Sequence, residues 1–185
     1  MKVSVCGYPV DCSASCALGN RRRLRHWCKV RPRVLFVCLG NICRSPLAEA
    51  AFRRAADEAG LVVTVDSAGT GNHHVGKPAD PRAIAEAARH GIDISGHRAR
   101  QLTPVDFEAF DWIVGMDTAN MKAIDAIRPA HSTTQTLRLL DIVGGDGRGD
   151  VPDPWLGDNE GFGWTWTVVE RGASVLAHSL LRDHG

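Results

Sequence analysis

The sequence predicts an α/β fold in which helices cover both faces of a parallel sheet. From residue 34 onward, short apolar runs typical of buried strands alternate with longer segments of helical periodicity. The chain has 185 residues, 44% of them hydrophobic, which suits one globular domain with a good-sized core. In sheets of this kind ligands bind at the carboxyl ends of the strands, so the residues that follow each strand are candidates for function.

The first part of the pattern is a strand, a helix and a second strand. Val34 to Cys38 is a continuous apolar run bounded by a proline and a glycine, as expected of a strand buried on both faces. Pro46 to Ala59 predicts a helix because proline suits a first turn, apolar residues recur on one face, and Gly60 follows the end. Leu61 to Val65 predicts the second strand.

The second part begins with a helix that Asp80 caps and Gly91 ends. The elements that follow are a third strand, a helix, a short fourth strand and a closing helix, at 112–114, 118–127, 137–140 and 162–181. The low-complexity segment at 144–149, "GGDGRG", predicts a mobile loop.

The N-terminal residues differ in charge from the rest of the chain. Residues 1–33 carry eight Lys or Arg against one acid, Asp11, whereas the remainder carries 14 Lys or Arg against 20 acids. We therefore expect a basic, Cys/Arg-rich and disordered tail at 1–32 and a domain at 33–185. The tail lacks any periodicity, so a further hypothesis is that translation starts near Val30.

Overall charge and hydropathy restrict the expected cellular location of the protein and the classes of partner that it can bind. The net charge of +1 and the pI of 7.7 argue against a nucleic-acid partner for the chain as a whole. The basic segment "RRRLRH" in the tail is the one candidate for contact with a nucleic acid or an acidic surface. No apolar run approaches the ~20 residues of a membrane span, and the N-terminus is a poor secretion signal. We expect a cytoplasmic monomer without a membrane partner.

Six cysteines in such a chain point to catalysis, metal binding or redox chemistry. Four of them lie in the tail at spacings that mostly do not suit zinc, so we expect no metal. The other two, Cys38 and Cys43, lie together at the end of the first strand, and no cysteine follows them.

Five residues separate Cys38 from Arg44 in "VCLGNICRSP". This spacing alone is weak, because Cys16 and Arg22 of the tail share it. The difference lies in the context, since a buried strand precedes Cys38 and a predicted helix begins after Arg44.

The context of this loop predicts an anion site. Gly40 and Asn41 tolerate the positive φ of a tight loop, and Ser45 with the proline after it opens the helix. Inward backbone N–H groups, the helix N-terminus and the planar fork of Arg44 suit a phosphate. The same field favours the thiolate of Cys38, which makes this residue a candidate nucleophile.

Four further motifs follow this loop along the chain: "DSAGTGNHHVGKPADPRA", "GHRARQLT", "VGMD" and "VPDPW". Together with the loop, they resemble the low-molecular-weight protein tyrosine phosphatases, and the resemblance covers residues 34–181. The resemblance implies a four-stranded parallel sheet, no metal or cofactor, and hydrolysis of phosphotyrosine in proteins through a cysteinyl-phosphate. It makes Cys38 the nucleophile and Arg44 the transition-state clamp. The expected phosphate-binding residues are Leu39, Gly40, Asn41, Ile42, Cys43 and Arg44, and the expected supporting residues are Ser45, Ser67 and His97.

Hydrolysis of phosphotyrosine needs an acid for the leaving phenolate and a base for water. Asp153 matches the family's Asp-Pro pair and lies between two prolines that stiffen its loop, so we expect it to fill both roles. Asp150 and Asp158 are alternatives, and each of the three is also compatible with an ordinary turn. Asp117 matches an aspartate near the family's active site, or caps the following helix.

The resemblance also implies a mouth for the substrate ring. Trp155 falls at the family's aromatic wall, and Leu39 and Ile42 are expected to line the mouth. His73 stands where the family often has an aromatic residue. A histidine at this position is expected to make binding of the substrate ring sensitive to pH. A threonine replaces Ile42 in the family's arginine phosphatases, so Ile42 favours phosphotyrosine.

Three alternatives concern redox chemistry and the class of protein. The resemblance implies a reversible disulfide between Cys38 and Cys43, although Cys43 is equally compatible with a passive role. Arsenate reductases of the same fold need further cysteines downstream, which this chain lacks. A non-catalytic binding module remains the alternative from another class, but Cys38, Arg44 and Asp153 together argue against it.

Overall fold

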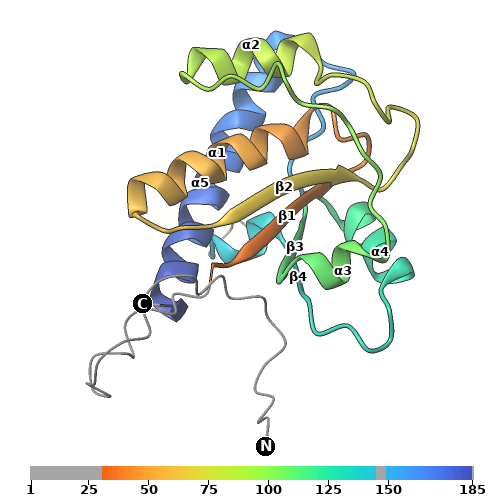
Figure 1. The fold of residues 1–185 in the computed structure, drawn as a ribbon. Helices are drawn as coiled ribbons and strands as arrows, with labels where there is room; N and C mark the ends of the chain where they lie inside the picture. The colour runs from red at the N-terminus through yellow and green to blue at the C-terminus, as the bar shows by residue number, and fades with distance from the viewer. Residues whose placement is uncertain (1–30, 145–148, 185) are drawn as a thin grey trace, which may run out of the picture. The chain divides into compact units, whose positions relative to one another are not determined.

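The computed structural model describes residues 31–144 and 149–184, so the expectations for residues 1–30 and for the loop at 145–148 lie outside the described residues. Four parallel strands form one sheet in the order β2-β1-β3-β4 (Figure 1). The strands are β1 (Arg33–Cys38), β2 (Thr64–Gly69), β3 (Trp112–Gly115) and β4 (Gln135–Arg138). The predicted α/β class is confirmed.

Five α-helices and a short 3₁₀ helix are described in these ranges. They are α1 (Arg44–Ala59), α2 (Pro81–Arg89), α3 (Asp106–Ala109), α4 (Thr118–Ile127), η2 (Leu139–Ile142) and α5 (Asn159–His184). None of them, α5 included, combines the length and the apolar composition needed to cross a membrane.

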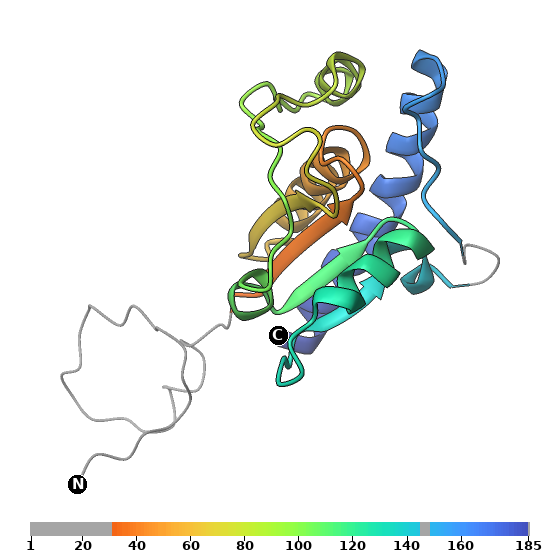
Figure 2. The same ribbon diagram turned by 90° about the vertical axis from the view of Figure 1, so that its right-hand side faces the viewer.

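The central strand β1 is buried on both faces, as its sequence predicts. Val34 and Phe36 pack into the core shared with α1, α2 and α5, whereas Leu35 and Val37 pack into a second core with α3 and α4. This alternation follows from the two-residue period of a strand. Figure 2 shows α5 on one side of the sheet and α3 and α4 on the other.

Two predicted strands are displaced along the chain. The second strand was expected at 61–65 but occupies Thr64–Gly69, because Leu61 donates its N–H to Ala56 and so completes the end of α1. The fourth was expected at 137–140 but occupies Gln135–Arg138, since pairing with β3 starts at Gln135 and the chain turns into η2 afterwards. The short helix α3 was not predicted.

The strand order determines where a ligand can bind. The chain leaves β1 toward β2 on one side and later returns to β3 on the other, so β1 and β3 flank a switch point. The loops after these two strands diverge there and leave room between them. Cys38 ends β1, and Asp117 follows β3 by two residues.

Candidate active site

Cys38 is 3% exposed at the carboxyl end of the central strand. Its Sγ lies 3.1 Å from Ser45 Oγ and accepts the backbone N–H of Asn41 at 3.2 Å. The loop of residues 39–43 joins β1 directly to α1, so it brings the sulfur, the backbone N–H groups and the helix N-terminus together. This is the arrangement expected of an anion site.

Asn41 holds the loop through its side chain and its backbone. It is the non-glycine residue with positive φ, 55°, among the described residues. Its Nδ2 donates to Ser45 Oγ at 3.0 Å and to Ser67 Oγ at 2.9 Å, and its Oδ1 accepts the N–H of Arg100 at 2.9 Å. His97 Nε2 donates to the Asn41 carbonyl at 2.7 Å. The predicted supporting residues are thus brought together around Asn41.

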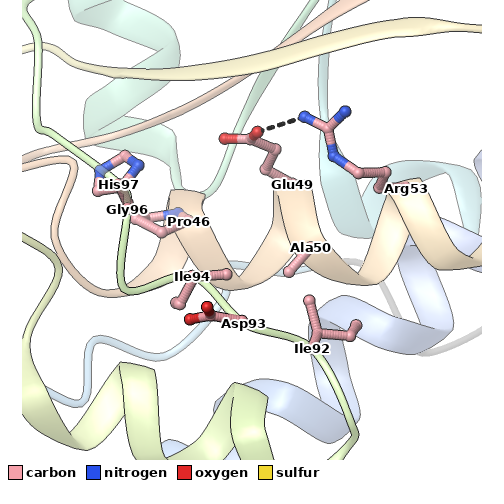
Figure 3. A pocket seen from close by; sticks show the side chains of 9 residues that line it. All are labelled: Pro46, Glu49, Ala50, Arg53, Ile92, Asp93, Ile94, Gly96 and His97. Carbon is pink, nitrogen blue, oxygen red and sulfur yellow. Dashed lines mark hydrogen bonds and ion pairs between the residues drawn. The ribbon is translucent and has the colours of Figure 1, made fainter.

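Glu49 of α1 extends this network and was not predicted. Its Oε2 accepts Ser67 Oγ at 2.8 Å, and its Oε1 accepts Arg53 Nη2 at 2.7 Å. Glu49 and His97 both line a cavity of about 230 Å³ between α1 and residues 92–97 (Figure 3). A carboxylate one helical turn beyond the loop was the available signal, but sequence alone could not give its partner.

Arg44 is 3% exposed and lies between two carboxylates. Its Nη1 donates to Asp117 Oδ2 at 2.5 Å and to the Val151 carbonyl at 3.3 Å, and its Nη2 donates to Asp153 Oδ2 at 2.6 Å. Burial alone would lower the pKa of Arg44, but Cys38 and the two carboxylates outweigh it and raise the pKa above its ordinary value. Arg44 is therefore a fixed cation beside Cys38.

Asp153 is the one of the three candidate aspartates that contacts Arg44. Its side chain is 43% exposed, and its Oδ1 accepts the N–H of Trp155 at 3.1 Å. Asp150 instead accepts the N–H and the hydroxyl of Thr118, and Asp158 accepts N–H groups in the first turn of α5. Asp117 fills both of its expected places, since it caps α4 through the Asn120 N–H as well as binding Arg44.

The mouth of the site is formed by exposed apolar and aromatic side chains. Leu39 is 55% exposed and Trp155 is 45% exposed, whereas Ile42 is 7% exposed and packs with the core. The ring of His74 lies 5.5 Å from that of Trp155, and a Cβ on Gly40 would come within 3.0 Å of His74 Cδ2. His74, which was not predicted, therefore lies beside Trp155 and Gly40, whereas the role expected of His73 stays a prediction.

Cys43 is a free, buried thiol within the same loop. Burial, with the neighbouring Asp80 and Cys38, raises the pKa of Cys43 far above its ordinary value. Its sulfur stays protonated at neutral pH, so Cys43 is a poor nucleophile in the folded protein. The disulfide with Cys38 stays a prediction.

A bound metal ion would need a group of His, Cys, Asp or Glu side chains as its ligands. Within residues 31–144 and 149–184, no three or more His, Cys, Asp or Glu side chains cluster in a way that could hold a metal ion. The site offers a sulfur, a buried guanidinium and a half-exposed carboxylate, which suits transfer of a phosphoryl group.

Comparisons with known proteins agree with this chemistry. Residues 33–184 match the family model described as low molecular weight phosphotyrosine protein phosphatase. A Schizosaccharomyces pombe protein of that name is 43% identical over 133 residues, which cover 70% of this chain and 85% of the relative. A Streptomyces coelicolor low molecular weight protein-tyrosine-phosphatase is 42% identical over 151 residues, covering 78% and 90%. The structure of YfkJ from Bacillus subtilis is similar, with a TM-score of 0.78, 37% identity, and coverage of 84% of this chain and 98% of that one.

Proposed function

Because this chain belongs to the low molecular weight protein tyrosine phosphatases, we propose that it hydrolyses phosphotyrosine through a cysteinyl-phosphate formed on Cys38. Its substrates are tyrosine-phosphorylated proteins. The proposed chemistry uses side chains and backbone N–H groups of this chain and needs no cofactor. The monomeric state, the cytoplasmic location and the absence of nucleic-acid and membrane partners stay sequence-based predictions.

In the first step the Cys38 sulfur attacks phosphorus, so that an S–P bond forms and the bond to the phenolic oxygen breaks. The N–H groups of residues 39–44 and the guanidinium of Arg44 bind the three equatorial oxygens as their charge spreads. Asp153, in its acid form, gives its proton to the departing phenolate.

In the second step water hydrolyses the cysteinyl-phosphate. Asp153, now a carboxylate, takes a proton from the attacking water, and the S–P bond breaks to release inorganic phosphate. Ser45 Oγ, 3.1 Å from Sγ, stabilises the departing sulfur. The ring of Trp155, with His74 packed beside it, offers an aromatic surface for the phenol of the substrate at the mouth.

One observation carries this proposal. Arg44 is bound on its two terminal nitrogens by Asp117 and Asp153, which brings the acid of a distant loop to within 2.6 Å of the cation beside Cys38. Asp117 binds one terminal nitrogen of Arg44 and Asp153 binds the other. In the proposed mechanism the phosphate takes over the nitrogen that Asp153 holds, and the Asp153 carboxyl, still bonded to its own turn, is then free to act on the leaving oxygen.

Steady-state hydrolysis of para-nitrophenyl phosphate and of phosphotyrosine, phosphoserine and phosphoarginine peptides tests the proposal. We expect selectivity for phosphotyrosine, no turnover by Cys38→Ser, and a loss of about 10²- to 10⁴-fold for Asp153→Ala on phosphotyrosine. Asp158→Asn is the matched control, since it keeps an acceptor for the α5 cap and should retain wild-type kcat/KM.

Two outcomes would reject parts of the mechanism. Full activity in Cys38→Ser would rule out the covalent intermediate, and full activity in Asp153→Ala would rule out this residue as the acid. A wild-type protein inactive under reducing conditions would favour the binding-module alternative.

A further inference from the structure

Arg82, in the first turn of α2, binds the segment that follows Asp153. Its Nη1 donates to the Gly157 carbonyl at 2.8 Å, and its Nη2 donates to the Trp155 carbonyl at 3.2 Å. The guanidinium also lies over the ring of Phe162, 4.6 Å from the centroid, near the start of α5. A single side chain thus holds the backbone of residues 155–157.

The same guanidinium is fixed to the phosphate-binding loop through Asp80. Arg82 Nε and Nη2 each donate to a different oxygen of the Asp80 carboxylate, both at 3.0 Å. The backbone N–H of Asp80 donates in turn to the carbonyl of Ile42, within that loop, at 2.8 Å. Contacts therefore run without a break from Ile42 through Asp80 and Arg82 to the turn after Asp153.

This turn leaves Asp153 little freedom of its own. The N–H of Gly157 donates to the Pro154 carbonyl at 3.0 Å, and the N–H of Trp155 donates to Asp153 Oδ1 at 3.1 Å. Because the carboxylate is bonded to the turn, fixing the turn fixes the carboxylate relative to Cys38. A shift of about 1 Å in a catalytic group costs up to about a hundredfold in rate.

We propose that Arg82 is the positioning residue for the general acid, which holds Asp153 at the distance from the phosphate-binding loop that protonation of the leaving oxygen requires. The described contacts of Arg82 reach Asp80, the turn after Asp153 and the ring of Phe162, but neither Cys38 nor Arg44, so its effect on the reaction runs through the position of Asp153. The inference rests on the proposed role of Asp153. Only the planar fork of arginine binds the Asp80 carboxylate and the two carbonyls at once, whereas the point charge of lysine does not.

Kinetics with two leaving groups test this role. Phenyl phosphate has a poor leaving group that needs the acid, whereas para-nitrophenyl phosphate has a good one that needs it much less. We expect Arg82→Ala to lower kcat/KM about tenfold or more for phenyl phosphate and far less for para-nitrophenyl phosphate. Arg82→Lys should restore only a minor part of the loss.

A double-variant cycle separates positioning from a general structural effect. In the Asp153→Ala background, adding Arg82→Ala should change kcat/KM for phenyl phosphate less than about twofold, because the group that it positions is gone. Inhibition by inorganic phosphate should be the same for Arg82→Ala and wild type, since Cys38 and Arg44 are untouched. Arg89→Ala, which removes an exposed partner of Glu86 on the same helix, is the matched control and should behave as wild type.

The outcomes distinguish this inference from the proposed function. If Asp153→Ala leaves phenyl phosphate turnover intact, the assignment of the acid is wrong. If Asp153→Ala is impaired but Arg82→Ala is not, the positioning role is wrong. Equal losses on both substrates, weaker phosphate inhibition, or full additivity in the double variant would overturn it too, because each indicates damage that does not act through Asp153.

Discussion

Asn41 combines two properties that the loop of residues 39–43 requires at one position. It adopts a φ of 55°, which most side chains avoid, and its amide both donates and accepts hydrogen bonds. Aspartate would tolerate the same backbone conformation without donating, and glycine would have no side chain to donate or accept. The sequence indicated the first property, and the family resemblance named Ser67, 26 residues away, as a supporting residue. Arg100, 59 residues away, was not predicted, because only the fold brings its N–H to this amide.

Asp80 links the stability of the protein to pH. Burial opposes its charge, yet hydrogen bonds from the Arg82 guanidinium and N–H outweigh this effect and hold the pKa of Asp80 below its ordinary value. A carboxylate whose pKa is lower in the folded state stabilises the fold at pH values above its unfolded pKa of about 3.9. This contribution is lost as the pH falls through the folded pKa.

We therefore expect Asp80→Asn to be less stable than wild type at pH 7, by about 1 kcal/mol, because asparagine keeps the helix cap but loses the charged partner of Arg82. The difference should shrink as the pH falls below about 4. Urea unfolding across this range measures it, with the exposed Asp125→Asn as the control that stays near wild type. A gap that does not change with pH would contradict the account.

At the scale of secondary structure, the end of β2 limits the shape of the catalytic loop. A Cβ on Gly69 would lie 2.8 Å from the Leu39 carbonyl oxygen and 3.2 Å from the Asn41 nitrogen, both of them backbone atoms. Gly60, at the end of α1, has a φ of 68° but open space around it. Replacing Gly60 should therefore affect only the stability of the fold, whereas replacing Gly69 should distort the loop that holds Cys38.

Gly69→Ala should lower kcat/KM for para-nitrophenyl phosphate by about tenfold or more, because the loop backbone must move to admit the methyl group. Gly60→Ala should instead cost about 1 kcal/mol in unfolding free energy, from the left-handed conformation, with kcat/KM unchanged. Steady-state kinetics and urea unfolding on both variants check the contrast. Wild-type kinetics in Gly69→Ala would show that the loop does not depend on this close approach.

The accuracy of the predicted elements follows from how local their signals are. Thr118–Ile127 was predicted at its observed bounds because a strand end, a cap and a helical pattern follow one another directly. The strand β2 was displaced because its last four residues, Asp66 to Gly69, are polar or small, and only pairing with β1 makes them part of a strand. The site followed the same rule, since Cys38 and Arg44 share one motif whereas Glu49, His74 and Arg82 act through partners from other segments.

At the scale of the whole molecule, the proposed chemistry lies within residues 33–184, which the family model covers. The described residues from 31 onward belong to one compact unit. We expect a chain lacking residues 1–30 to hydrolyse para-nitrophenyl phosphate with the kcat/KM of the full chain. The two proteins should be compared under reducing conditions, because the removed segment contains four of the six cysteines. A clear loss of activity in the shorter chain would give the basic tail a part in the site.

The contacts around Arg44 and Asn41 join residues that are far apart along the chain. Asn41 meets Ser67 and His97 at separations of 26 and 56 residues, and Arg44 meets Asp117 and Asp153 at separations of 73 and 109. Closing loops of this length is slow compared with forming helices. During synthesis, a nascent chain on the ribosome can therefore fold α1 long before it can cleave a phosphate ester. In the proposed mechanism the acid is Asp153, so a nascent chain that has not yet exposed residue 153 lacks this acid and cannot complete the site.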